Sequence, residues 1–243
     1  MKKTVFLASA ALLLSLAANT SQVFAAEGGT YPTQGTINFE AGDDVTPPVD
    51  PEDPDIPIDP VDPPTPVGGS LSIDYASQWK FGTQKISTTD QTYFAQLDQF
   101  KDSEGKPTIE KPNYVQVTDK RGTLEGWSLS VTQPEQFKTA DGDELTGAAL
   151  KIKTAAIAGL SGSDTYASGT VAASIDLTPG QEAAGITAEK TKGAGTWVYR
   201  FGNDADTGKK AIELDVPGKT VKLAKEYKTT LNWTLASTPG NNN

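Results

Sequence analysis

Few residue patterns in this sequence could support catalysis, and each lacks an essential partner. The stretch Gly126-Trp127-Ser128-Leu129-Ser130 lacks only the last glycine of the G-x-S-x-G nucleophile elbow. The chain contains no histidine, so no imidazole can activate Ser128. Ser77 and Lys80 match the S-x-x-K pattern of penicillin-interacting enzymes, but neither K-T-G nor S-D-N occurs. The sequence therefore favours a protein that is not an enzyme and has no catalytic residues.

Carboxylates offer two further kinds of chemistry. A pair of acids could hydrolyse a glycan, although some pair will fall at a suitable distance by chance in so acidic a chain. The stretches 141–144 (DGDE) and 203–208 (NDADTG) contain residues of the kind found in calcium loops, but neither completes the EF-hand pattern. Both are more typical of hairpin turns. Cysteine and histidine are absent, which excludes disulfides and Cys- or Cys/His-type zinc sites. We expect no metal and no cofactor.

Acidic residues are concentrated in one stretch of the chain. The formal net charge of the 243 residues is −10. Residues 26–67 contain ten acids and no lysine or arginine, whereas residues 68–243 contain 21 acids and 19 bases. A nucleic-acid-binding surface needs a basic stripe, and the sequence has none. The composition therefore predicts no nucleic-acid partner.

The first 25 residues have the pattern of a secretory signal peptide. Lys2 and Lys3 precede an apolar run over residues 5–18, and small residues follow at Val23 and Ala25. We expect cleavage after Ala25. No later stretch is long and apolar enough to span a membrane, and the C-terminus has no sorting sequence or hydrophobic tail. The expectation is an exported protein, retained at its site by binding. An exported chain without cysteine fits Gram-positive bacteria.

Residues 26–67 are expected to form a spacer. Proline recurs at every third position from Pro48 to Pro66, with aspartate at five of the twelve positions between. Polyproline II has three residues per turn, and like charges repel, so the pattern predicts an extended, solvated segment. Ahead of it, Gly35–Phe39 (GTINF) alternates apolar and polar residues and could be a short strand.

Residues 68–243 are expected to form an all-β domain. Apolar residues alternate with polar ones in six segments, and glycine- or proline-containing turns separate them. The segments are 71–75, 127–131, 171–177, 197–201, 212–216 and 227–235. Such alternation predicts sheets that are covered on one face, and so an antiparallel β-sandwich-like domain. The segment 91–100 (QTYFAQLDQF) is ambiguous between a helical turn and a strand.

Two of the expected strands carry the same pattern, tryptophan and leucine separated by one residue. Trp127 and Leu129 form the first pair, and Trp233 and Leu235 the second. Residues two apart in a strand lie on the same face, so each tryptophan lies beside its leucine. Burial of such a pair would stabilise the core. Tryptophan is also a favoured binding anchor, so both a core role and a recognition role stay open.

The two Trp-x-Leu motifs and their flanking residues resemble the WxL-domain family of Gram-positive surface proteins. The resemblance extends over nearly the whole chain after the signal peptide. The first motif follows the stretch 112–122 (PNYVQVTDKRG), and the second lies near the C-terminus within residues 231–235 (LNWTL). The matching opening of the domain is the stretch 69–75 (GSLSIDY).

The resemblance implies a β-rich domain that attaches non-covalently to the cell wall by binding peptidoglycan. On this interpretation the protein is not an enzyme, and the candidate binding residues are Trp127, Leu129, Trp233 and Leu235. An alternative from a different class is an assembly protein that binds companion surface proteins, including membrane-anchored WxL-interacting ones. An exposed row of aromatic side chains would favour the glycan. A large apolar patch or an unpaired edge strand would favour a protein partner.

Overall fold

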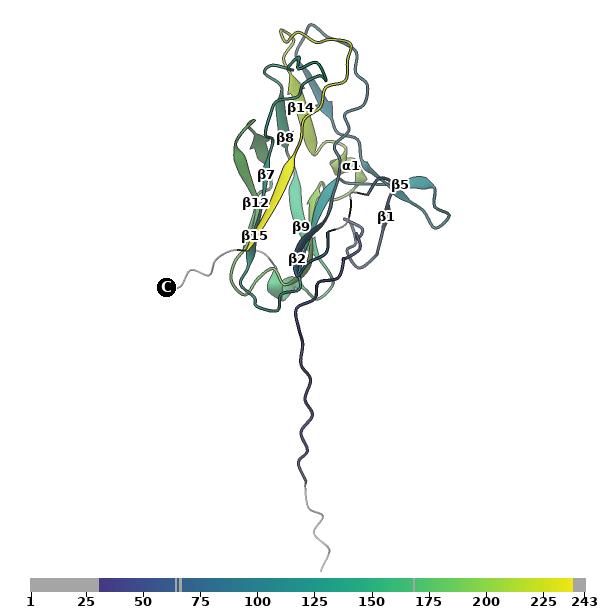
Figure 1. Cartoon of the computed structure of the whole chain (residues 1–243). Coiled ribbons are helices and arrows are strands. Elements are labelled where there is room, and N and C mark those ends of the chain that lie inside the picture. The colour runs from purple at the N-terminus through teal and green to yellow at the C-terminus, as the bar shows by residue number, and fades with distance from the viewer. Residues whose placement is uncertain (1–30, 64, 66, 168, 238–243) are drawn as a thin grey trace, which may run out of the picture. The chain divides into compact units, whose positions relative to one another are not determined.

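The computed structural model describes residues 31–63, 65, 67–167 and 169–237. The signal peptide expected over residues 1–25 lies outside them. The chain divides into two units, one up to Asn38 and one from Phe39 onward. In the first unit the described residues are exposed and form no helix or strand, so the strand expected over Gly35–Phe39 is not formed. The second unit is built of strands, with one short α-helix (Figure 1).

Four antiparallel sheets make up the second unit. The motif sheet has the order β10 (Thr170–Val171), β12 (Glu182–Ala188), β7 (Trp127–Thr132), β15 (Asn232–Ser237). The central sheet has the order β2 (Leu71–Ala76), β6 (Tyr114–Asp119), β13 (Gly195–Phe201), β9 (Ala155–Gly159). The end sheet has the order β11 (Ile175–Leu177), β8 (Ala149–Ile152), β14 (Ile212–Val216), β3 (Gln91–Phe94). The side sheet has the order β1 (Asp59–Pro60), β4 (Asp98–Lys101), β5 (Pro107–Lys111).

The motif sheet and the central sheet pack face to face around the main core. Leu129, Val131 and Ile186 of the motif sheet share one buried cluster with Val117 and Tyr199 of the central sheet. Each of these side chains lies on the face of its strand that points into the main core, because alternate residues of a strand share a face. The end sheet adds its own inward residues to the same cluster and lies at one end of the body (Figure 1). The expected all-β, antiparallel fold is confirmed.

The central sheet is covered on both faces, which makes it the middle layer of the molecule. All six residues of β6 are buried. Val115 and Val117 belong to the main core. Tyr114, on the other face, forms a second core with Phe100 of the side sheet and Val49. The second core is therefore closed by the part of the chain that was expected to be a spacer.

Residues 49–62 fold against the central sheet, in contrast to the extended, solvated segment expected from the proline period. The chain reverses direction in a turn, in which the amide of Ile56 donates to the carbonyl of Asp53 at 3.0 Å. Val49 then pairs with Pro57, and the amide of Val49 donates to the side-chain oxygen of Gln116 in β6 at 2.8 Å. The polyproline II interpretation fails because apolar residues between the prolines gain burial by docking.

Cations from the rest of the domain pair with four of the six acids of this segment. The ammonium of Lys111 lies 2.8 Å from the carboxylate of Asp50 and 2.6 Å from that of Glu52. Lys101 pairs with Asp59, and Lys80 pairs with Asp62, each at 3.2 Å. The like-charge repulsion assumed for an isolated spacer is therefore offset by ion pairs that sequence order does not reveal.

Other segments also differ from the strands expected. The ambiguous stretch 91–100 forms two strands, β3 and β4, which belong to different sheets. The stretch 171–177 is divided between β10 and β11, again in different sheets. The alternation expected over 227–235 becomes a strand only from Asn232 onward. A 3₁₀ turn over Asp164–Tyr166, η1, completes the elements.

Candidate functional site

The two Trp-x-Leu motifs lie side by side on paired strands. β7 and β15 are antiparallel neighbours, with Leu129 opposite Leu235 and Val131 opposite Trp233. The motif residues therefore share the inner face of the motif sheet, as alternation in a strand requires. β7 is an inner strand of the sheet, whereas β15 is its last strand.

The first motif is fully buried. Trp127 and Leu129 are 0% and 1% exposed. The indole nitrogen of Trp127 donates to the carbonyl of Gly193 at 2.9 Å, so the polar atom of the ring is satisfied inside the core. Gly193 has a φ of 78°, and a Cβ there would lie 2.3 Å from that nitrogen. A glycine at this position is therefore required to accommodate the ring.

The second motif is only half-buried. Trp233 and Leu235 pack on the main core but keep part of their surface exposed. The indole of Trp233 stacks on Phe201 with ring centres 6.0 Å apart and meets Trp79 edge-on at 6.4 Å. A tryptophan at the last strand of a sheet closes the side of the sandwich and borders its surface at the same time.

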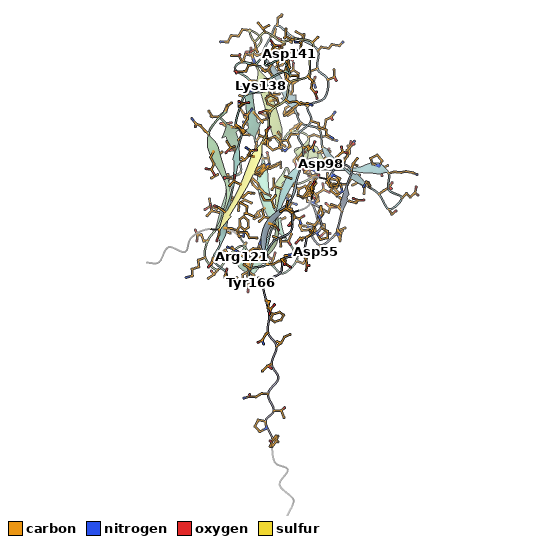
Figure 2. All side chains as sticks on the ribbon, viewed as in Figure 1. Asp55, Asp98, Arg121, Lys138, Asp141 and Tyr166 are labelled. Atoms are coloured by element: carbon orange, nitrogen blue, oxygen red, sulfur yellow. The ribbon has the colours of Figure 1, made fainter. Side chains whose placement is uncertain are left out.

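Arg121 joins one end of both motif strands. Its guanidinium donates to both carboxylate oxygens of Asp119, at 2.9 and 2.8 Å, and to the carbonyl of Gly126 at 2.7 Å. A third nitrogen donates to the hydroxyl of Ser237, the last residue of β15, at 2.7 Å. The hydrogen bond with Asp119 raises the pKa of Arg121 above its ordinary value. Figure 2 labels Arg121 near the end of the body opposite Lys138 and Asp141.

A groove lies at the other end of the same two strands. Its volume is about 920 Å³. One wall is the loop that follows β7, and the other is the segment that precedes β15. The lining residues are Pro134, Glu135, Gln136, Lys138, Thr139, Ala140, Asp141, Gly142, Lys225, Glu226, Lys228, Thr229, Thr230 and Asn232. The paired motif strands thus carry both walls of the groove.

Hydrogen bonds hold the two walls together. The backbones of Lys138 and Lys228 exchange two hydrogen bonds, each 2.9 Å long. The hydroxyl of Thr229 donates to the carbonyl of Glu135 at 2.6 Å and receives a bond from the side-chain amide of Gln133 at 3.3 Å. The groove is preorganised by these contacts, which lowers the ordering cost of binding.

Opposite charges are interleaved across the groove. The ammonium of Lys225 lies 2.8 Å from the carboxylate of Asp141 and 3.3 Å from that of Asp143. A hydrogen bond from Thr139 and the pairing with Lys225 lower the pKa of Asp143, and the two carboxylates raise the pKa of Lys225. Asp143 and Lys225 are therefore charged at neutral pH. The groove can bind charged and hydrogen-bonding groups of either sign.

Two of the residues considered for catalysis, Ser77 and Lys80, have structural partners. The hydroxyl of Ser77 accepts a hydrogen bond from the amide of Tyr114 at 2.9 Å, and Lys80 pairs with Asp62. Ser128 lies on the outer face of β7, half-buried. The contacts of Ser77 and Lys80 therefore serve the fold.

The two stretches compared with calcium loops fold differently from each other. Residues 139–143 form a tight turn between Lys138 and Glu144, as expected for a hairpin. The hairpin turn expected over 203–208 is wrong. Asp204 instead caps the short helix α1 (Ala205–Gly208), because its carboxylate accepts from the amide of Thr207 at 2.8 Å. Among the described residues, no group of three acids is placed to hold a metal ion.

Comparison with protein families places this geometry in a known group. The family model described as "WxL domain surface cell wall-binding" matches residues 26–239. The chain belongs to the WxL family. No curated protein and no solved structure matches it. The match begins directly after the expected cleavage site and includes both motif strands and the docked acidic segment.

Membership of the WxL family shows what the domain does in outline. The protein is a cell-surface protein with a wall-binding domain, and the family is one of binding domains rather than enzymes. In the part of the chain described here, no helix is long and apolar enough to cross a membrane.

The sequence prediction named the motif residues of the WxL domain but missed the groove. Trp127 and Leu129 lie in the core, and Trp233 and Leu235 lie at its edge; none of the four lines the groove. A signal was present in the sequence. The loop after the first motif is rich in acids and the segment before the second is rich in lysines, but only the pairing of β7 with β15 shows that they face each other.

Proposed function

We propose that this WxL protein is exported, is cleaved after Ala25, and attaches non-covalently to peptidoglycan as a non-enzymatic binding protein. The observation that carries the proposal is the groove at the end of the β7–β15 pair. It is a concavity whose walls are joined by hydrogen bonds, and it is carried by the two paired strands that contain the Trp-x-Leu motifs.

The chemistry of the groove favours the peptide part of peptidoglycan. None of its lining residues is aromatic, so it offers no platform for stacking on a sugar ring. It presents lysines, carboxylates and threonine hydroxyls instead. Stem peptides carry amino and carboxyl groups that such a surface can pair with. In this account the first motif fixes β7 in the core, and Trp233 and Leu235 fix β15 at the edge, so that the groove walls are held in register.

A charge reversal in the groove tests the proposal. The experiment is co-sedimentation of the purified mature chain with purified peptidoglycan, without any other protein. Lys228 has an exposed side chain in an ion pair with Glu226, so Lys228→Glu should change stability little. We expect it to weaken co-sedimentation about fivefold or more. Lys209, exposed and paired with Asp206 away from the groove, provides the matched control Lys209→Glu, which should bind like the wild type.

Two outcomes would overturn the proposal. Wild-type protein that stays in the supernatant would refute direct binding to peptidoglycan. Lys228→Glu and Lys209→Glu variants that bind equally well would place the binding surface outside the groove.

A second candidate function is the binding of a companion surface protein, such as a membrane-anchored WxL-interacting protein, with wall attachment indirect. The unpaired outer edge of β15 favours it, because an edge strand can accept a strand from another protein. Co-sedimentation that appears only when the companion is added would support this function over the first.

A further inference from the structure

Half-buried apolar side chains form a strip along the outer edge of β15. β15 is the last strand of the motif sheet and β2 is the last strand of the central sheet, and the two contact each other. Leu71 and Ile73 of β2, Trp233 and Leu235 of β15, and Trp79 all pack on the core yet stay partly exposed. We call these five side chains the seam. They mark the side on which the sandwich is incompletely closed.

β15 lacks the features that normally protect an edge strand. Its residues, Asn232–Ser237, include no charge and no proline, and their register with β7 is unbroken. The other outer strands are better protected. β5 carries Pro107 and Lys111, β2 is bulged, and β1, β10 and β11 have two or three residues each. β3 has four residues, and β9 is partly covered by the segment after β10. A regular, uncharged edge is a template for another strand.

The segment Gly35–Phe39 has the pattern of a strand without a partner. Ile37 and Phe39 are 75% and 87% exposed, which is unusual for apolar side chains of this size. Thr36 and Asn38 are the polar residues that alternate with them. In an extended strand Ile37 and Phe39 would share one face, and Thr36 and Asn38 the other.

β15 divides its side chains in the same way. Trp233 and Leu235 face inward, whereas Asn232, Thr234 and Ala236 are exposed on the outer face. A strand added beside β15 with Ile37 and Phe39 facing inward would place both apolar side chains on the seam. Its polar residues would continue the polar outer face of the motif sheet. The reverse register would expose the apolar pair, so the pattern specifies one arrangement.

We propose that Gly35–Phe39 of one copy pairs with the outer edge of β15 in a second copy, with Ile37 and Phe39 packed on the seam. A second copy fits because each chain carries one donor segment and one acceptor edge, so that a two-fold exchange satisfies both at once. The inference stands independently of the wall-binding groove, because none of the seam residues lines it.

Sedimentation velocity of the mature chain, residues 26–243, tests the association. We expect a concentration-dependent dimer. The double variant Ile37→Asp/Phe39→Asp should raise the dimer dissociation constant about a hundredfold or more, because two apolar side chains lose their burial. The matched variant Thr36→Asp/Asn38→Asp adds the same charge to the opposite face of the same segment, and it should still dimerise.

Engineered cysteines identify the contact, since the natural chain has none. Asn38→Cys protein is mixed with protein carrying Asn232→Cys, Thr234→Cys or Ala236→Cys, on the outer face of β15. We expect a disulfide-linked dimer with at least one of them. Asp176→Cys, exposed on β11 in the end sheet, is the control and should not cross-link.

Three results would overturn the inference. The first is a monomer at every concentration, which would show that the edge of β15 does not bind a second copy of the chain. The second is a dimer that survives Ile37→Asp/Phe39→Asp. The third is a disulfide formed within one chain by a protein carrying both cysteines, which would show that the segment pairs with its own β15.

Discussion

The two Trp-x-Leu motifs have the same sequence pattern and different environments. Trp127 and Leu129 lie on an inner strand and are inaccessible to water, whereas Trp233 and Leu235 lie on an edge strand and are half-buried. The register places Leu129 opposite Leu235, so the difference arises from strand order and not from a different face. The burial of each motif therefore depends on the strands beside it in the sheet. The sequence of the motif does not specify which strands these are.

The difference also divides the roles of the motifs. The first motif stabilises the core, and its indole satisfies a specific carbonyl there. The second motif packs on the core, belongs to the seam and lies on the strand whose first residue lines the groove. Substitution of the first motif should therefore lower mainly the free energy of unfolding. Substitution of the second should lower both the free energy of unfolding and the affinity of association.

The largest effect is expected from Trp127→Ala. Removal of a fully buried indole leaves a cavity and the carbonyl of Gly193 without its donor, so the free energy of unfolding should fall by about 3–5 kcal/mol. Denaturant unfolding monitored by circular dichroism measures it. A loss below about 1 kcal/mol would contradict the burial of this ring.

Trp233→Ala should destabilise the protein less, by about 2 kcal/mol, because only part of the indole is removed from water. The same unfolding measurement applies, with Trp233→Phe as a control that keeps an aromatic ring beside Phe201. If Trp233→Ala were as destabilising as Trp127→Ala, the contrast between the motifs would be refuted.

Arg121→Lys tests the contact that joins both motif strands. Lysine keeps the charge but cannot donate to Asp119, Gly126 and Ser237 together. We expect a loss of about 1–2 kcal/mol in the free energy of unfolding. Lys209→Arg, at an exposed position, is the control for an exchange between lysine and arginine. Unchanged stability in Arg121→Lys would show that the ends of the strands are held by other contacts.

Asp215 supplies a reference in the end sheet, which carries neither motif. Its hydrogen bonds from Lys151 and Thr92 lower its pKa below 3.8. A carboxylate with a lowered pKa stabilises the fold above its unfolded pKa and loses that contribution as the pH falls through the folded value. Asp215→Asn should therefore lower stability by about 0.5 kcal/mol at neutral pH, since the pair is partly exposed. In thermal melting, the difference in stability between the wild type and Asp215→Asn should disappear as the pH falls below 3.8. A difference in stability that persisted in acid would contradict the stabilising role of the Asp215 carboxylate.

Sequence alternation predicted the strands that have one face in water. β7 and β14 begin and end close to the expected positions because their polar residues point outward. β6 was not among the expected strands, although Val115 and Val117 alternate with Gln116 and Thr118; both of its faces are covered, and these polar side chains are buried. Thr118 and Gln116 donate to the carboxylate of Asp74 at 2.5 and 3.0 Å, and desolvation raises the pKa of Asp74.

The docked acidic segment could not be predicted from its own composition. Its prolines and aspartates fit a solvated chain equally well. Docking depends on Lys111, which binds Asp50 and Glu52 from a position 59 residues or more away in the sequence. Long-range partners of this kind also explain the missed groove. Its two walls are separated by more than 80 residues and meet only because β7 pairs with β15.

The central claim is that the paired motif strands position the wall-binding groove, and mapping by NMR tests it most directly. Chemical shifts of the isotope-labelled mature chain are recorded as a soluble muropeptide carrying a stem peptide is added. We predict that the perturbed amides lie in the loop 134–142 and the segment 225–232, on both walls of the groove. Perturbations confined to other surfaces, such as the side sheet and the docked acidic segment, would contradict the account.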